Sequence, residues 1–150
     1  MKILVDADSF PRQARETVLR ASRRTGIPAI FAANRPIPGV IEGNAVMEVC
    51  EAREGAADDR IFQLARPGDL VLTRDVPLAS RLVASQVMVI DDRGQVYTPE
   101  NIRERLSLRN FMVYLAESGL WLRRSATYGK RELKAFADSF DHILTKATRP

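Results

Sequence analysis

Apolar stretches of strand length alternate with stretches of helical spacing along the first 90 residues, and this alternation most limits the folds open to the chain. The apolar runs are 2–6, 28–33, 69–73 and 87–90, with a weaker one at 45–50. Helical segments separate them at about 11–24, at about 57–65 and from Pro77 onward. Strands that alternate with helices pair in parallel through right-handed crossovers, and a strand that is apolar throughout is covered on both faces. We therefore expect an α/β protein with a mainly parallel sheet.

Two more helices are expected in the last third, from about Pro99 to Ser118 and from about Arg131 to Lys146. Asp8 or Ser9 could cap the first helix of the chain, and Thr98 could cap the helix from Pro99. No repeat or linker divides the chain. We expect a single domain over 1–150, with 99–150 as a helical extension.

The metal chemistry open to the chain is limited by its ligands. Cys50 is the only cysteine and His142 the only histidine, which excludes an internal disulfide and a thiolate–imidazole zinc site within one chain. Any metal must be held by oxygen, which favours Mg²⁺ or Mn²⁺. Asp6 interrupts the apolar start, and no apolar run approaches the roughly 20 residues of a membrane span. We expect a cytoplasmic protein with no membrane partner.

Acidic residues follow the predicted strands. Asp6 and Asp8 follow the first strand, Asp75 the fourth, and Asp91-Asp92 the fifth. Asp58-Asp59 begin the helix that leads into the fourth strand, and they should enter from the same side if the third strand feeds that helix directly. The carboxyl ends of parallel strands meet at one rim, where ligands bind. One aspartate alone commonly ends a strand or caps a helix, but several converging carboxylates repel one another unless a cation neutralises them. We expect a metal site whose carboxylates, from Asp6, Asp8, Asp58 and Asp75, lie within one coordination shell.

Such a cluster permits two chemistries. In one, Mg²⁺ or Mn²⁺ activates water against a phosphodiester. In the other, an aspartate attacks a phosphoryl group, as in haloacid-dehalogenase-type phosphatases. Asp6-Ala7-Asp8, Thr73 and Asp91-Asp92 superficially match that second pattern. Those enzymes also need a lysine near the phosphoryl group, and this chain has none between Lys2 and Lys130.

The positive charge is concentrated in the last third of the chain. The net charge is +4, and residues 100–150 carry ten basic and six acidic side chains, whereas residues 1–99 are balanced. A basic segment beside an acidic site suits a polyanion such as nucleic acid, although a solvated helix surface has the same composition. The densest basic segment is Arg123, Arg124, Lys130, Arg131 and Lys134, with Trp121 and Tyr128 nearby as surfaces for base stacking or core packing.

The motifs resemble those of the bacterial YaiI/YqxD family over nearly the whole chain. They are Asp-Ala-Asp-Ser-Phe-Pro at 6–11, Ala-Ala-Asn at 32–34, Ala-Ala-Asp-Asp at 56–59, Pro-Gly-Asp-Leu-Val-Leu-Thr-Arg-Asp at 67–75, Ile-Arg-Glu-Arg-Leu at 102–106 and Leu-Arg-Asn-Phe-Met at 108–112. The resemblance implies a PIN-like nuclease fold, a three-layer α/β/α sandwich whose relatives bind Mg²⁺ or Mn²⁺ with aspartates and cut RNA. Positions that match the family are Asp6, Asp8, Asp58, Asp75, Asn34, Thr73, Arg109 and Arg131.

Three positions depart from the family pattern. Phe10 replaces the family's cysteine, Asn110 replaces an acid, and 122–125 replaces a Thr-Gly-Gly-Pro loop and adds Arg123 and Arg124. A thiol role at position 10 is therefore excluded, and the changed loop could alter specificity.

Together these features predict a Mg²⁺- or Mn²⁺-dependent phosphodiesterase that acts on RNA rather than DNA. Asp6 and Asp75 would hold the principal ion, Asp8 and Asp58 would complete its shell, and Thr73, Arg74 or Arg109 would position the phosphate. Asn34, Arg123, Arg124 and Arg131 complete the predicted substrate-binding set. The alternatives are a non-catalytic nucleic-acid- or metal-binding protein and, third, the phosphatase.

Overall fold

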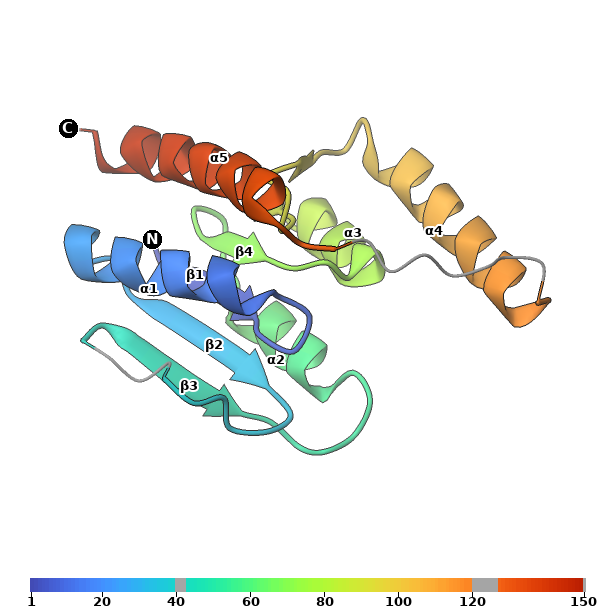
Figure 1. The fold of residues 1–150 in the computed structure, drawn as a ribbon, viewed down its shortest axis with the longest axis horizontal. Helices are drawn as coiled ribbons and strands as arrows, with labels where there is room; N and C mark the ends of the chain where they lie inside the picture. The colour runs from blue at the N-terminus through green and yellow to red at the C-terminus, as the bar shows by residue number, and fades with distance from the viewer. Residues whose placement is uncertain (40–42, 120–126, 150) are drawn as a thin grey trace.

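The fold is taken from a computed structural model that describes residues 1–39, 43–119 and 127–149. In these residues one six-stranded sheet has the order β3-β2-β1-β4-β5-β6 (Figure 1). Neighbouring strands run parallel except β5 and β6, which are antiparallel. The strands are β1 (Ile3–Asp6), β2 (Ala29–Ala33), β3 (Ala45–Val49), β4 (Leu70–Leu72), β5 (Met88–Ile90) and β6 (Val96–Tyr97).

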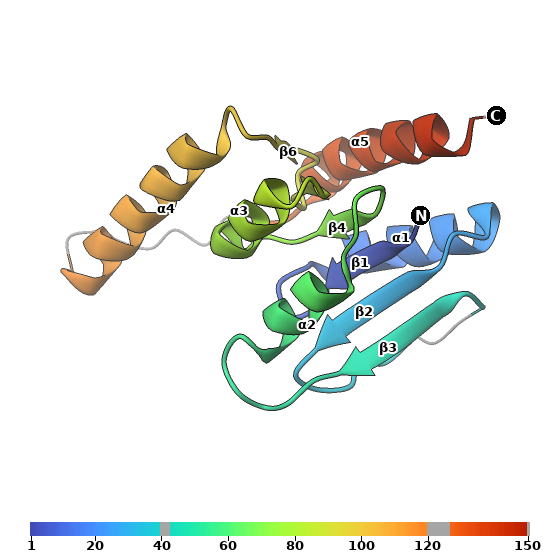
Figure 2. The same ribbon diagram turned by 180° about the vertical axis from the view of Figure 1, so that it is seen from behind.

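Helices cover both faces of the sheet. On one face lie α1 (Arg12–Thr25) and α5 (Lys130–Thr148), and on the other lie α2 (Ala56–Leu64) and α3 (Val76–Ala84). The helix α4 (Ile102–Glu117) begins beside α3 and extends away from the sheet (Figure 2). The predicted three-layer α/β/α arrangement with a mainly parallel sheet is confirmed.

Alternate residues of β1 enter different cores, which explains why the strand is apolar throughout. Ile3 and Val5 pack in the core beneath α1 and α5, together with Phe136. Leu4 packs in the core beneath α2 and α3, together with Leu78. Successive side chains of a strand point to opposite faces, so a sheet covered on both sides leaves no polar position within this strand.

The last helix is anchored on the turn between β5 and β6. Ser139 Oγ donates a hydrogen bond of 2.7 Å to the carbonyl oxygen of Gly94. A Cβ atom at Gly94 would lie 2.5 Å from the Ala135 carbonyl oxygen, and the residue also has a positive φ of 78°. Only glycine fits here without displacement, because both its backbone conformation and the helix contact exclude a side chain.

Several local predictions differ from the structure. Neither Asp8 nor Ser9 caps α1, which has Pro11 at its N-cap and no side-chain capping bond. Thr98 does not cap α4, because that helix begins at Ile102, and Thr98 instead exchanges hydrogen bonds with Asn101 in the preceding turn. The two-residue β6 was not predicted, because it is too short to show a periodic pattern. None of the helices described combines the length and apolar composition needed to cross a bilayer.

Candidate functional site

The carboxyl ends of β1 and β4 lie side by side at the point where the sheet topology switches. From β1 the chain adds β2 and β3 on one side of the sheet, and β4, β5 and β6 on the other. Such a switch point leaves a crevice at the carboxyl ends of the strands, where open α/β sheets bind ligands. Asp6 is the last residue of β1, and Thr73, Arg74 and Asp75 directly follow β4.

A pocket of about 260 Å³ occupies this crevice. The four predicted carboxylates and the predicted Asn34 all line it, and Ser9 and Glu54 are additional polar members. The prediction that Asp58 enters from the same side as the strand-end aspartates is therefore confirmed. We call this the acidic pocket. No lysine or arginine from the described part of the chain lines it.

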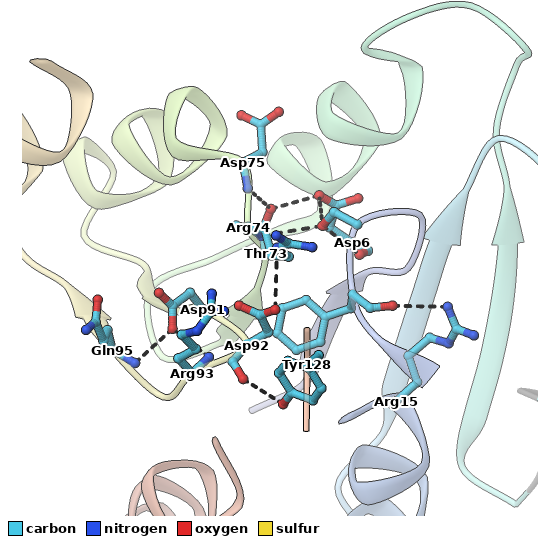
Figure 3. A network of polar contacts seen from close by, with 12 residues as sticks. Asp6, Arg15, Thr73, Arg74, Asp75, Asp91, Asp92, Arg93, Gln95 and Tyr128 are labelled. Atoms are coloured by element: carbon cyan, nitrogen blue, oxygen red, sulfur yellow. Dashed lines mark hydrogen bonds and ion pairs between the residues drawn. The ribbon is translucent and has the colours of Figure 1, made fainter. Parts of the chain in front are cut away.

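Asp6 is the most firmly held of these acids. Its side chain is buried, and its Oδ2 atom accepts hydrogen bonds from Thr73 Oγ1 and Ser9 Oγ, both at 2.8 Å. Burial raises the pKa of Asp6, while these two hydrogen bonds oppose the rise and the charges of Asp75 and Asp8 add to it. Thr73 Oγ1 also accepts from the backbone N–H of Asp75 at 2.9 Å, so one hydroxyl connects the two strand-end acids (Figure 3).

Asp75 and Asp58 enter the acidic pocket from the starts of two helices. Asp75 is the N-cap of α3, and its Oδ1 accepts from the backbone N–H of Leu78 at 2.8 Å. Asp58 lies in the first turn of α2 and lines the same pocket as Asp75. Burial, followed by the charges of Asp6 and Asp75, raises the pKa of Asp58 to about 7. The acidic pocket therefore disfavours a full complement of negative charges.

Asp8 and Asn34 also line the acidic pocket. Asp8 Oδ2 accepts from the backbone N–H of Asn34 at 2.9 Å. The side-chain oxygen of Asn34 is buried without a hydrogen-bond partner, and it is the one such side-chain atom in the described residues. A buried amide oxygen without a partner is costly, so this atom indicates room for a ligand with positive character.

The donor set suits a hard divalent cation. In the described residues no three Asp, Glu, His or Cys side chains are arranged to hold one ion, so the four aspartates share a pocket but not one coordination shell. Mg²⁺ is commonly bound through one or two carboxylates and keeps several waters, so it does not require three protein carboxylates. Carboxylate oxygens and the Asn34 amide oxygen are the ligand type that Mg²⁺ and Mn²⁺ prefer. The residues present therefore fit either ion.

Arg74 lies at the rim of the acidic pocket, where its side chain pairs with Asp92, a residue outside the pocket lining. Its Nε atom lies 3.4 Å from Asp92 Oδ2, and its backbone N–H donates to Ser9 Oγ at 3.4 Å. Asp92 is buried, and burial raises its pKa against the opposing charge of Arg74. The Asp92 carbonyl oxygen accepts from Tyr128 Oη at 2.7 Å (Figure 3). The sequence analysis missed this chain of contacts, because only the folded β5–β6 turn brings Tyr128 to Asp92.

Other predicted residues lie elsewhere. Asp91 accepts hydrogen bonds from the backbone of Arg93 and Gln95 and from Arg105, so it closes the β5–β6 turn. Arg109 is exposed on α4, donates to Asn110, and does not line the acidic pocket. Arg131 is exposed at the start of α5. Trp121, Arg123 and Arg124 fall outside the described residues.

Comparisons with known proteins agree on one group. The profile of the family described as "Uncharacterized BCR, YaiI/YqxD family" matches residues 4–146. A "UPF0178 protein" of Treponema pallidum is 48% identical over 149 residues, which cover 99% of this chain and 84% of the relative. Proteins of the same name are 44% identical in Treponema denticola, covering 99% of this chain and 95% of the relative, and 36% identical in Vibrio parahaemolyticus, covering 97% and 99%. No solved structure matches the chain.

Proposed function

The chain belongs to the YaiI/YqxD family, and we propose that it is a Mg²⁺- or Mn²⁺-dependent phosphodiesterase that cleaves RNA. The names of its relatives state no activity, so the proposal rests on the acidic pocket. The observation that carries it is the gathering of four carboxylates and an unpartnered amide oxygen at the switch point of a parallel sheet. With no basic side chain of the described residues lining that pocket, a bound cation is the simplest way to relieve the repulsion.

The residues of the acidic pocket divide into ligands and supports. Asp6 and Asp75 would hold the principal ion, with Asp8, Asp58 and the Asn34 side-chain oxygen completing its surroundings. When bound, the ion supplies activation of water and neutralisation of phosphate charge. Thr73 and Ser9 keep the Asp6 carboxylate in one orientation through their hydrogen bonds. Arg74, fixed by Asp92 at the rim, offers a cation to the phosphate.

The choice of RNA rests on the resemblance to PIN-like nucleases. Their three-layer α/β/α architecture and aspartate-lined site agree with the arrangement found here. The absence of a lysine or arginine from the described lining of the acidic pocket counts against a phosphatase of the haloacid-dehalogenase type. Such an enzyme needs a lysine at the phosphoryl group, whereas Lys2 forms an ion pair with Asp69 and the remaining lysines follow position 129.

A cleavage assay with a matched variant tests the proposal. Purified protein with Mn²⁺ should cleave end-labelled single-stranded RNA, and Asp6→Asn should abolish the cleavage while leaving RNA binding intact. Asp59→Asn is the control, because Asp59 lies on the same helix turn as Asp58 but pairs with Arg53 and Arg81 outside the acidic pocket. It should cleave as the wild type does.

Two other results would replace the proposal. Salt-sensitive RNA binding without metal-dependent cleavage would favour a non-catalytic nucleic-acid-binding protein. Hydrolysis of a small phosphate ester, with RNA left intact, would favour the phosphatase. A melting temperature that millimolar Mn²⁺ and Mg²⁺ leave unchanged would argue against any metal site, since an ion that binds only the native state must stabilise it.

A further inference from the structure

A second pocket of about 360 Å³ lies beside the acidic pocket and has the opposite charge. Asp8 lines both pockets and so separates them. The second is lined by Arg15 from α1 and by Arg35 with Pro36–Pro38 from the loop after β2. We propose that this arginine pocket binds a phosphate group of the nucleic-acid strand, next to the phosphate held at the acidic pocket. The identity of the ligand as a nucleotide strand rests on the proposed function.

Arg15 is positioned in advance for an anion. Its Nη1 atom donates to the carbonyl oxygens of Ala7 and Phe10, both at 3.1 Å, which fixes the plane of the guanidinium. Figure 3 draws one of these two bonds. Carbonyl partners carry no full charge, so the cation is oriented without being neutralised. Both bonds use Nη1, and the Nε–Nη2 edge has no hydrogen bond to the described residues. That edge presents two parallel N–H groups, the geometry with which arginine holds phosphate.

Arg35 supplies a second cation from a stiff loop. The side chain is exposed and forms no ion pair with any carboxylate of the described residues. Pro36 and Pro38 restrict the backbone on its C-terminal side, and Ile37 packs against the core beneath α1. The loop is also tied to the acidic pocket, because the backbone N–H of Asn34 donates to Asp8. The backbone of Arg35 is therefore held before an anion binds, and only its exposed side chain has to be ordered.

The position of this pocket selects a phosphate within a polymer over an isolated anion. A free anion gains from two arginines but is repelled by the neighbouring aspartates. A nucleotide strand can place one phosphate on the arginines while the next lies at the acidic pocket, where the proposed cation offsets the repulsion. Single strands tracked by cations along their backbone bind in this way without sequence preference.

Binding measured in EDTA tests the arginine pocket independently of the metal and of cleavage. Overall affinity should be lower there than with the metal, because the acidic pocket then repels the neighbouring phosphate, so each variant is compared with the wild type in the same buffer. The probes are two fluorescent RNA tetranucleotides, identical except that one carries a terminal phosphate. Arg35→Gln should lower affinity about tenfold, the effect of losing one charge-assisted contact. Arg20→Gln, an exposed arginine on α1 outside this pocket, removes the same charge and should bind as the wild type. Arg35 has no hydrogen-bond or ion-pair partner among the described residues to lose, so its variant should fold normally.

The two probes identify which phosphate is bound. If only the phosphorylated probe loses affinity on Arg35→Gln, the pocket holds a terminal monoester. If both lose it equally, the pocket holds an internal diester. Arg15→Lys, which keeps the charge but removes the fork, should lower affinity for the same probe. Unchanged affinity in both variants would overturn the proposal, whether or not Mn²⁺ supports cleavage. Reduced affinity without any cleavage would instead reject the phosphodiesterase and keep the arginine pocket.

Discussion

At the scale of single residues, Asp58 and Asp59 show how neighbouring carboxyls acquire opposite roles. Asp58 faces the acidic pocket, where burial and two other acids raise its pKa to about 7. Asp59 faces outward, where hydrogen bonds from Arg81 and Arg53 lower its pKa. Sequence position alone predicted that the pair enters from the ligand side of the sheet. Which of the two faces the pocket depends on the rotation of α2, which its short apolar pattern does not specify.

Asp58→Asn should therefore stabilise the protein in EDTA at pH 8. The substitution removes a charge that the folded state disfavours, and we expect the free energy of unfolding to rise by about 1 kcal/mol, a value reduced for the partial exposure of the side chain. Asp59→Asn makes the same chemical change but removes two ion-pair contacts, so it should give no rise. Urea denaturation of both variants measures the difference. Equal effects of the two substitutions would show that Asp58 does not experience the other acids.

The pKa of Asp69 is lowered in the folded protein, whereas that of Asp58 is raised, so its contribution to stability depends on pH in the opposite sense. Burial alone would raise the pKa of Asp69, but hydrogen bonds from Lys2 and from the backbone N–H of Arg66 outweigh it and hold the pKa below its usual value. A depressed folded pKa contributes stability above the unfolded value, and that stability is lost as pH falls through the folded value. Asp69→Asn should cost about 2 kcal/mol at pH 7 and progressively less below about pH 4. Urea denaturation at pH 7 and pH 3 checks this, and a cost independent of pH would contradict it.

Among the helices and strands, the positions of the long helices were predicted well, but which of their faces other elements cover was not. Phe136, Phe140 and Leu144 recur at helical spacing within the predicted last helix, and all three are buried on one face of α5. The sequence of α4 is at least as apolar, yet Ile102 is the one buried residue in it. Periodicity shows that a helix has an apolar side, but not whether another element covers it. The capping prediction for α1 was wrong because tertiary contacts occupy the two side chains. Ser9 donates a hydrogen bond to Asp6, and Asp8 accepts one from the backbone N–H of Asn34.

Two phenylalanines make this contrast measurable. Phe136→Ala should lower the free energy of unfolding by about 3–5 kcal/mol, because the ring is fully buried between Phe10 and Phe140. Phe111→Ala, on α4, should change it by less than about 0.5 kcal/mol, because that ring is 55% exposed. Denaturation of both variants compares the helices directly. A large cost at Phe111 would mean that α4 is covered in solution.

The docking of α5 has its own test at Gly94. Gly94→Ala places a methyl group against the Ala135 carbonyl and requires a left-handed backbone for alanine, so we expect a loss of about 2 kcal/mol or more. Ser139→Ala removes only the hydrogen bond to Gly94 and should cost about 1 kcal/mol. Thermal denaturation ranks the two variants. If Gly94→Ala were the milder change, the close approach of α5 to this turn would be incorrect.

At the scale of the whole molecule, an acidic pocket lies within a protein of net charge +4. The strand ends predicted the pocket because a parallel sheet aligns its carboxyl ends whatever the loops do. The cations were harder to place, because their positions depend on loops and on exposed helix faces. Tyr128, just before α5, bonds to Asp92, and Asp92 pairs with Arg74 at the pocket rim. Lys130 and Arg131 follow Tyr128 closely at the start of α5, whereas Arg109 lies on the outlying α4 and does not line the acidic pocket.

This arrangement predicts how RNA binding depends on salt. Each phosphate contact with a single strand releases counterions and contributes about 0.7 to the slope of log affinity against log salt concentration. Arg131→Gln should weaken binding and reduce that slope by about 0.7, because Arg131 lies in the first turn of α5, just after Tyr128, which bonds to Asp92. Arg103→Gln removes the same charge from an exposed position of α4 that does not line the acidic pocket, and it should leave the slope unchanged. Titration of single-stranded RNA at several salt concentrations, in EDTA, measures both slopes. Equal reductions in the two variants would mean that RNA responds to the overall charge of the protein, and not to cations arranged around the acidic pocket.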